Sequence, residues 1–292
     1  MKLVTYSDKT LLLTKEFNLI AETKLKSAIK FWNWITEDKD FNLLIPFAER
    51  VIEYTYAANL NKNNKDKYEL FNKMLYAISF YSINRGRTHE SVQFGKLKNN
   101  KILIPEIKKV SSIWEYFVYV ALISRNSNLI NSITSIDSSL IDIPEITNGH
   151  RYKKAYIQFL ISFINENQLN DSYLDLMQFQ YDATEEIIPE FKSDFSFWIY
   201  LYEPIVSAIK ALSNEDKDSF KSSLVLALNH HKSYWSSSKP MNKGGTPPFQ
   251  DYEGLVSFPC TALAAIAVDK GWDIGVKSDY MPQYMVDGSI NK

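Results

Sequence analysis

The chain has 292 residues, of which 45% are hydrophobic and 23% are charged, which is ordinary for a folded soluble protein. Its 33 basic and 34 acidic residues leave a formal net charge of −1. This balance gives no electrostatic case for direct binding of nucleic acid, and none for mimicry of DNA by an acidic surface. Nine glycines and ten prolines are too few for the dense turns of an all-β protein.

Cysteine usage and hydropathy predict a cytoplasmic protein that does not bind a membrane. Cys260 is the only cysteine, so no internal disulfide can form, which fits a reducing compartment. The first thirteen residues are a poor signal peptide, because Asp8 and Lys9 interrupt the apolar stretch. The longest uncharged run, 254–268, contains Pro259 and is shorter than the roughly twenty apolar residues that a membrane span needs.

Helical periodicity dominates the first half of the chain. The first twenty residues show no clear pattern and could form a short helix. Apolar residues at three- and four-residue steps then predict helices over 21–35, 41–60 and 68–81, and again from 111 to about 125. Between these helices, the segments 92–97 and 101–104 resemble a short β-hairpin near 92–104, which would have to pack on the helical body to be stable.

The second half of the chain is also helical. The Ser-, Asn- and Asp-rich region 126–149 predicts a small helix and a loop, and it is the candidate junction between two halves. Helices are then expected over 152–166, 172–188, 195–212, 215–235 and 255–270.

We therefore predict an all-α fold, either an irregular multi-helix bundle or a solenoid of antiparallel α-hairpins. No strict repeat of about 34 residues is present, so a tetratricopeptide array is not predicted. The chain is expected to be one helical domain, 1–292. A two-lobed organisation, with lobes 1–125 and 150–292 joined by the loop region 126–149, remains open.

Histidine and cysteine, the two residue types that most often act as nucleophiles or metal ligands, have structural explanations in this chain. His230 and His231 are adjacent on a predicted helix and point about 100° apart, so they cannot easily share one metal ion. The pattern predicts that His231 is a semi-buried packing residue and that His230 is exposed. Cys260 lies inside an apolar run and is expected to be a small core residue.

Scattered acidic residues leave an enzymatic alternative open, because a pair of them could perform acid–base catalysis. These are Glu115, Glu203, Asp251, Glu253, Asp269 and Asp279. Glu203 lies in an otherwise apolar helix, and we expect it to brace a neighbouring helix. The chain contains no phosphate-binding glycine loop, no paired-cysteine motif and no metalloprotease or serine-hydrolase motif. We therefore predict that the protein is not an enzyme and holds no cofactor and no metal.

The segment from Asp251 to Gly288 is the most distinctive part of the chain. It contains Glu253-Gly254, Pro259, Ala262-Leu263-Ala264, Ala267, Asp269-Lys270-Gly271 and 276–282 with the sequence VKSDYMP. Upstream lie Glu203-Pro204, Ala211-Leu212, Phe220, His231-Lys232 and Tyr234-Trp235. In this order the elements, which span about the last ninety residues, resemble the immunity protein 49 family (Imm49) of bacterial polymorphic toxin systems.

The resemblance implies an all-helical cytoplasmic protein that binds and neutralises a cognate toxin, with that toxin's C-terminal toxic domain as the partner. Inhibition would occur by occlusion of the toxin's active site, and a nuclease is a reasonable guess for the toxin. The oligomeric state remains open. A helical scaffold or adaptor for another partner is the alternative function, followed by an enzyme with dispersed acidic residues.

The residues of the resemblance divide into two groups. A structural signature is expected to provide packing and helix ends, and it comprises Glu203, His231, Trp235, Gly254, Pro259, Asp269, Gly271 and Pro282. A polar rim is the candidate partner-binding surface, and it comprises Asp251, Tyr252, Glu253, Asp279 and Tyr280. We expect Gly254 to permit a close approach of two backbones or an unusual turn, and Gly271 to end a helix.

Overall fold

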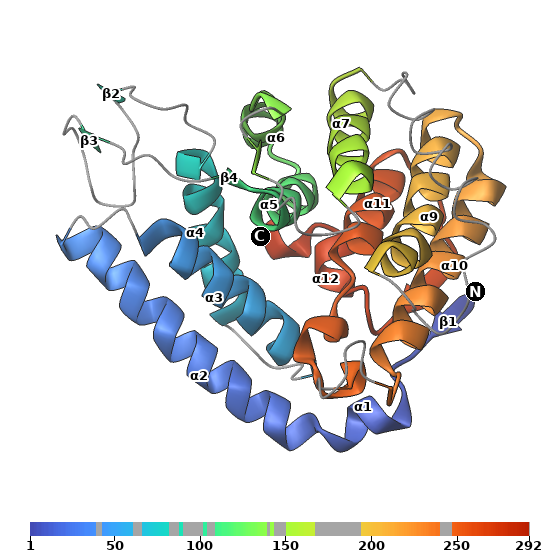
Figure 1. Cartoon of the computed structure of the whole chain (residues 1–292), viewed down its shortest axis with the longest axis horizontal. Coiled ribbons are helices and arrows are strands. Elements are labelled where there is room, and N and C mark those ends of the chain that lie inside the picture. The colour runs from blue at the N-terminus through green and yellow to red at the C-terminus, as the bar shows by residue number, and fades with distance from the viewer. Residues whose placement is uncertain are drawn as a thin grey trace. The chain divides into compact units, whose positions relative to one another are not determined.

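The structure is a computed structural model of the whole chain. It describes residues 1–38, 43–60, 66–81, 88–89, 102–103, 109–138, 141–142, 150–166, 194–239 and 247–291. The predicted helix over 172–188 lies outside these ranges. The described part is an all-α fold, as the sequence predicts, with three two-stranded sheets as its only sheets (Figure 1).

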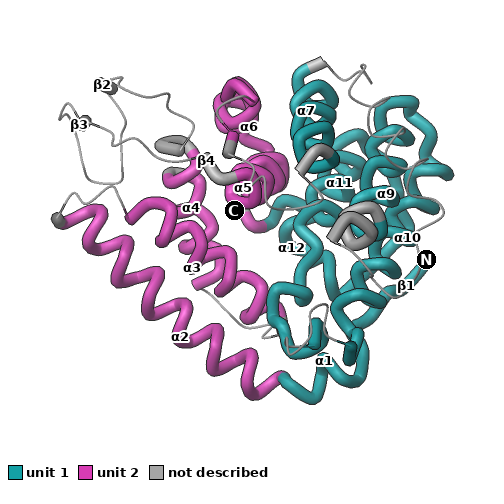
Figure 2. Tube along the Cα trace, viewed as in Figure 1, with its two compact units in different colours: residues 1–13, 143–289 teal, residues 14–142, 290–292 magenta. Residues whose placement is uncertain are grey.

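The chain divides into two compact units (Figure 2). Unit 1 comprises residues 1–13 and 143–289, and unit 2 comprises residues 14–142 and 290–292. The boundary near residue 142 lies within the polar region 126–149. The first thirteen residues belong with the second half of the chain, and the sequence pattern does not indicate this.

Unit 2 contains the helices α2 (Thr14–Asn33), α3 (Leu44–Ala57), α4 (Asp66–Tyr81), α5 (Ser111–Ser124) and α6 (Ser127–Thr134), with the short helical turns η1 (Trp34–Asp38) and η3 (Ala58–Leu60). Its strands are β2 (Thr88–His89), β3 (Ile102–Leu103), β4 (Lys109–Val110) and β5 (Ile141–Asp142). α2 packs along α3, α3 packs on α4, and α5 packs on α6. Successive helices are therefore neighbours in space, as short connections favour.

The β-structure of unit 2 differs in part from the predicted hairpin. β2 pairs antiparallel with β3, with Thr88 opposite Leu103 and His89 opposite Ile102. The second predicted strand, 101–104, contains β3, but its partner lies at 88–89 instead of 92–97. Residues 92–97 are outside the described ranges. A second pair, β4 with β5, is parallel, and the sequence did not predict it.

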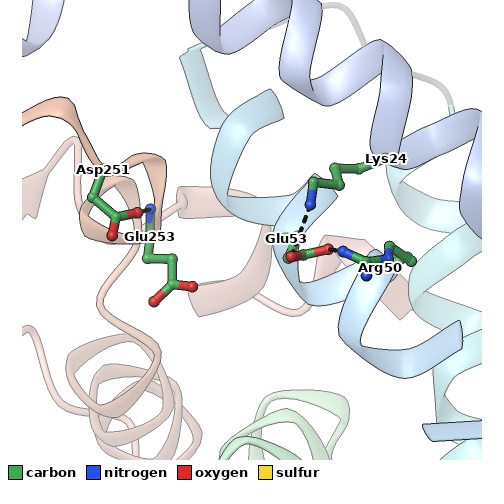
Figure 3. A network of polar contacts seen from close by, with 5 residues as sticks. All are labelled: Lys24, Arg50, Glu53, Asp251 and Glu253. Atoms are coloured by element: carbon green, nitrogen blue, oxygen red, sulfur yellow. Dashed lines mark hydrogen bonds and ion pairs between the residues drawn. The ribbon is translucent and has the colours of Figure 1, made fainter. Parts of the chain in front are cut away.

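α2 begins earlier than its pattern predicted, at Thr14 instead of residue 21. It buries Phe17, Ala21 and Ala28, whose spacing of four and seven residues places them on one face. Lys24 extends from this helix to Glu53 of α3 at 2.8 Å, and Arg50 donates to the same carboxylate (Figure 3). Burial alone would raise the pKa of Glu53, but hydrogen bonds from the two cations outweigh it and lower that pKa.

Unit 1 contains α1 (Asp8–Leu12), α7 (His150–Glu166), α9 (Asp194–Ser213), α10 (Lys217–Trp235), α11 (Phe258–Asp269) and α12 (Gln283–Val286), with the 3-10 turns η5 (Pro248–Gln250) and η6 (Tyr252–Leu255). Its strands are β1 (Lys2–Val4) and β6 (Val276–Ser278), and η7 (Ser289–Asn291) follows α12 across the boundary of the units. α9 and α10 pack on each other and α11 packs on both. Asp216 is the N-cap residue of α10, and its side chain accepts a hydrogen bond from Ser219 N at 3.0 Å.

α11 lies at the centre of the unit 1 core. Its alanines at 262, 264, 265 and 267 are fully buried, and such small side chains let neighbouring helices approach closely. The helix begins at Phe258 instead of the predicted residue 255, because Tyr252–Leu255 form a separate 3-10 turn. Pro259 lies in its first turn, where a missing backbone N–H leaves no helix hydrogen bond unmade.

Candidate functional site

The closing segment of unit 1, defined as residues 251–282, brings most of the distinctive sequence elements together. It contains η6, α11 and β6, and all three contact α10. α10 supplies His231 and Trp235, which form one side of the site. Residues about twenty positions apart in the sequence therefore become neighbours.

Gly254 allows η6 to lie directly against α10. A Cβ atom built on Gly254 would be 2.4 Å from Cγ of Trp235 and 2.6 Å from Cβ of Trp235. These distances are far below van der Waals contact, and Cβ cannot move without the helix backbone. A side chain at 254 would displace the Trp235 side chain or α10, so the backbone of η6 lies directly against Trp235.

His231 joins the same two elements by a hydrogen bond. Its Nε2 donates to the Gly254 carbonyl oxygen at 2.9 Å, and since a carbonyl can only accept, the proton is on Nε2. Burial lowers the pKa of His231 to about 4, although the hydrogen bond to Gly254 opposes this shift. The imidazole of His231 is thus neutral at pH 7. Its side chain is half-buried, as the sequence pattern predicts.

Aromatic rings surround the imidazole of His231. Tyr280 meets it edge-on with centroids 5.2 Å apart, and Trp235 lies at 6.1 Å. The neighbouring His230 differs from its prediction, because it is half-buried instead of exposed. It stacks on Tyr200 at 4.0 Å, and its Nδ1 lies 2.8 Å from the Tyr200 carbonyl oxygen.

The first six residues of the chain bind the closing segment through hydrogen bonds. β1 pairs with β6 in parallel, with Leu3 opposite Lys277, and Asp279 N donates to Val4 O at 3.1 Å. The Tyr6 hydroxyl lies 2.7 Å from the Leu255 carbonyl oxygen and 2.9 Å from that of Asp279, so its single proton is shared between two acceptors. Tyr6 N also donates to the Asp279 carboxylate at 3.1 Å. We call these contacts of residues 1–6 the N-terminal clasp.

Removal of the Tyr6 hydroxyl is expected to weaken this clasp. Tyr6→Phe leaves the buried Leu255 carbonyl without its side-chain donor, which we expect to lower the free energy of unfolding by about 1–2 kcal/mol. Urea unfolding followed by tryptophan fluorescence measures the change. Leu3→Ala is the matched control, since Leu3 is 65% exposed on the adjacent strand and should change stability by less than about 0.5 kcal/mol. Equal stability of Tyr6→Phe and wild type would contradict the role of the clasp.

The predicted polar rim is only partly a surface. Glu253 and Asp279 are exposed, while Asp251 and Tyr252 are half-buried. Tyr280 is 1% exposed, and burial raises the pKa of its hydroxyl. Its side chain is a core group packed on Tyr6 at 4.7 Å, which corrects the prediction that it faces a partner.

Asp251 is the N-cap residue of η6, at the start of the closing segment. Its Oδ1 accepts from Glu253 N at 2.9 Å and so caps η6 (Figure 3). Burial raises the pKa of the Asp251 carboxyl despite this bond. Burial also raises the pKa of the nearby Tyr234 to about 12, helped by the negative charges of Asp251 and Glu253. The carboxylate of Asp251 thus has a structural role in addition to its place in the rim.

The end of α11 shows how the signature shapes the backbone. Gly271 has a φ of +75°, a left-handed conformation that favours glycine. Its N–H donates to Val268 O at 2.8 Å and the N–H of Trp272 donates to Ala267 O at 3.0 Å, which is the Schellman pattern. Asp269 is the last residue of α11 and is exposed. Pro282 is buried at the N-cap of α12.

Glu203 lies away from this site, on α9. Its side chain is half-buried. Burial, together with the negative charge of Glu203, raises the pKa of Tyr152 on α7. Beside it, Lys153 Nζ donates to the Tyr202 hydroxyl at 3.4 Å, and burial lowers the pKa of Lys153 to about 7. Charged and phenolic groups of α7 and α9 therefore lie together, where we expected Glu203 to brace a neighbouring helix.

Two further candidate residues, Cys260 and Glu115, are buried. Cys260 is fully buried, as predicted, and burial raises the pKa of its thiol to about 12, which disfavours the nucleophilic thiolate. Glu115 is also buried, on α5 of the other unit. In the described ranges, no three His, Cys, Asp or Glu side chains are grouped so that they could hold a metal ion. The helices of the same ranges include none that could cross a membrane.

Sequence reasoning missed Tyr6, although this residue touches both ends of the closing segment. Nothing in the sequence links residue 6 to residues 255 and 279, because the contacts join positions about 250–270 apart. The only available signal was that the first residues did not continue the helical pattern. A short β-strand before a helix can produce such a break.

Comparison with known proteins identifies one family. The family model described as immunity protein 49 matches residues 84–285. This match is longer than the C-terminal resemblance, and it includes the closing segment, α10, α9, α7 and the second half of unit 2. No curated protein and no solved structure matched. Because the family model covers more than half of the chain, the protein belongs to the immunity protein 49 family.

Proposed function

We propose that this chain is an immunity protein that binds a cognate bacterial toxin and so neutralises it. Its membership of the immunity protein 49 family over residues 84–285 is the observation that carries the proposal. The toxin belongs to a polymorphic toxin system, and the segment bound is its C-terminal toxic domain. The site of action is the cytoplasm.

The chemistry of the chain favours neutralisation by occlusion over modification of the toxin. The closing segment, which contains the distinctive residues, uses them for packing: His231 is neutral, Cys260 is fully buried, and Asp251 caps a helical turn. An occluding protein needs a stable surface that covers the toxin's active site and excludes its substrate, and it needs no reactive group of its own. A net charge of −1 gives no reason for competition at nucleic acid, so we expect direct binding to the toxin.

Co-expression tests the proposal. The C-terminal domain of a toxin encoded next to this chain is expressed alone and together with it in a sensitive host. We expect growth to stop with the toxin domain alone and to recover at least about 100-fold in colony count when this chain is present. A toxin domain from an unrelated system serves as the specificity control, and no recovery is expected with it.

The mechanism is tested on the purified proteins. Occlusion predicts a stable complex in size-exclusion chromatography and an unchanged mass of the recovered toxin domain. If this chain accumulates in folded form but does not restore growth, the proposal is wrong. Growth recovery with a cleaved or modified toxin and no stable complex would favour the enzyme alternative.

A further inference from the structure

Residues 1–13, which we call the N-terminal segment, belong to unit 1 although the chain that follows them belongs to unit 2. Three side chains of the segment are buried, namely Val4, Tyr6 and Thr10, and the others are half-buried or exposed. The N-terminal clasp adds the strand pairing of β1 with β6 and the two bonds of the Tyr6 hydroxyl. A small set of contacts therefore holds the segment in place.

A single residue joins the N-terminal segment to unit 2. α1 ends at Leu12 and α2 begins at Thr14, so Leu13 alone separates the two helices. Leu13 has a φ of −93° and a ψ of 14°, which lie at the margin of the helical region. Its N–H donates to Thr10 O at 3.2 Å, a bond over three residues where a continuous α-helix has four. A small rotation at Leu13 would merge α1 and α2 into one helix, so Leu13 is a hinge.

The N-terminal segment carries much of the exposed apolar surface of the chain. Nine large hydrophobic side chains are prominently exposed in the described ranges, and four of them, Met1, Leu3, Leu11 and Leu12, lie in the first twelve residues. Leu12 is 80% exposed and Leu11 is 49% exposed, and both lie directly before the hinge. Isolated exposed leucines are common, whereas adjacent ones form an apolar patch that association covers.

The closing segment recognises residues 1–6 through several independent contacts. β6 pairs with β1 in one register, and the Leu255 and Asp279 carbonyl oxygens accept from the Tyr6 hydroxyl. The Tyr280 ring packs on the Tyr6 ring at 4.7 Å. Every copy of the chain has both the segment and the surface it binds. Residues 1–6 of a second copy therefore meet the closing segment with the same bonds, and their exchange sacrifices no contact of the clasp.

We propose that two copies of this chain exchange their N-terminal segments, so that residues 1–6 of each copy clasp the closing segment of the other. Leu13 becomes helical and directs the segment to the second copy. Each hinge then passes from one copy to the other, so the two hinges run side by side and cover Leu11 and Leu12. The longer helix and this apolar contact favour the dimer, and loss of translational freedom opposes it. The dimer fraction consequently rises with protein concentration.

Cysteine cross-linking tests the exchange directly. Leu3 and Lys277 are paired across β1 and β6 and both are exposed, so cysteines at these positions are within reach of a disulfide. Leu3→Cys and Lys277→Cys chains are mixed, incubated and treated with oxidised glutathione. Exchange predicts a disulfide-linked species of twice the 33.8 kDa chain mass on a non-reducing gel. The native Cys260 does not compete, because it is fully buried.

Two controls define the result of the cross-linking. Each single variant alone measures random collision, since exchange places neither cysteine opposite a copy of itself, and the mixture should give at least about tenfold more linked species. The Leu3→Cys/Lys277→Cys double variant should form the disulfide within one chain at low concentration. If it does not, the pairing of β1 with β6 is wrong and the proposal has no basis. If it does, and the mixture gives no more linked species than each variant alone, the N-terminal segment does not exchange.

A matched pair of substitutions tests the hinge. Leu13→Ala and Leu13→Gly remove the same side chain, but alanine favours a continuous helix and glycine disfavours it. Light scattering at several concentrations gives the association constant of the dimer, which should be at least about fivefold higher for Leu13→Ala. Equal constants would contradict the proposal, because the exchanged dimer requires a helical Leu13.

Substitution of Leu12 tests the contact beside the hinge. Leu12→Lys places a charge where the two hinges meet, so it should lower the association constant by at least about fivefold. Leu226→Lys is the matched control, since Leu226 is 48% exposed on α10 and should leave the constant within about twofold of wild type. A dimer that Leu12→Lys leaves intact would use another surface and overturn the proposal. All these measurements use the purified chain alone, so their outcome does not depend on the proposed function.

Discussion

Substitution of Gly254 by alanine is expected to lower the free energy of unfolding by about 3 kcal/mol. The new methyl group would be 2.4 Å from Cγ of Trp235, so η6 and α10 must separate. Separation also lengthens the 2.9 Å hydrogen bond from His231 to the Gly254 carbonyl. Urea unfolding followed by circular dichroism at 222 nm measures the loss.

A double-mutant cycle with Trp235→Ala is the control for this prediction. Truncation of the indole removes Cγ and Cδ2, two of the three atoms that the new methyl group would meet, and leaves Cβ at 2.6 Å, so Gly254→Ala should cost about 1 kcal/mol less in the Trp235→Ala background but should still destabilise it. Strictly additive losses would mean that the close approach of η6 and α10 does not explain the glycine. Gly271→Ala offers a comparison without a steric clash, because nothing lies within 4 Å of the Cβ atom there and only the positive φ is strained.

Acidification is expected to destabilise the protein through His231. The folded-state pKa of about 4 is below the ordinary value of 6.5, so between these pH values the unfolded chain binds a proton that the folded chain does not. Stability from this group is complete above pH 6.5 and falls as the pH decreases towards 4. The shift corresponds to about 3 kcal/mol over this window.

Unfolding experiments between pH 4.5 and 7.5 measure this dependence. His231→Gln can still donate to the Gly254 carbonyl but does not titrate, so its stability should change less with pH than that of wild type. The difference between the two profiles isolates His231 from the carboxylates, which are the same in both proteins. Parallel profiles would show that His231 is not buried in its neutral form.

The local features of the fold could be predicted from the sequence because they depend on nearby residues. The period of three to four residues indicated most of the described helices, and α5 has nearly the bounds that were expected. The Asp269-Lys270-Gly271 stop predicted the end of α11, since a left-handed cap depends on one residue without a Cβ. The first residues of helices were predicted less accurately. The first turns of α2 lack a clear apolar stripe, so its predicted start at residue 21 is later than its observed start at Thr14.

The candidate surfaces show why sequence alone was not sufficient. Tyr280 and Asp279 are adjacent, but the ring of Tyr280 is buried against Tyr6 while Asp279 is exposed. A polar tyrosine next to an aspartate gives no indication of this difference, because burial depends on what packs above each side chain. The same reason applies to Trp34, whose exposure could not be distinguished by pattern from that of the half-buried Trp32.

The sequence by itself determined the all-helical class of the protein, the absence of a disulfide and the family to which it belongs, since helix periodicity, cysteine count and family motifs are properties of residues close together in the chain. Only the tertiary structure decided which residues of the motifs meet. It placed Gly254 against Trp235, joined Tyr6 to Leu255 and Asp279, and left Lys30 and Trp34 exposed on α2. These contacts and exposures depend on how distant segments pack, and side-chain packing is a property of the whole unit.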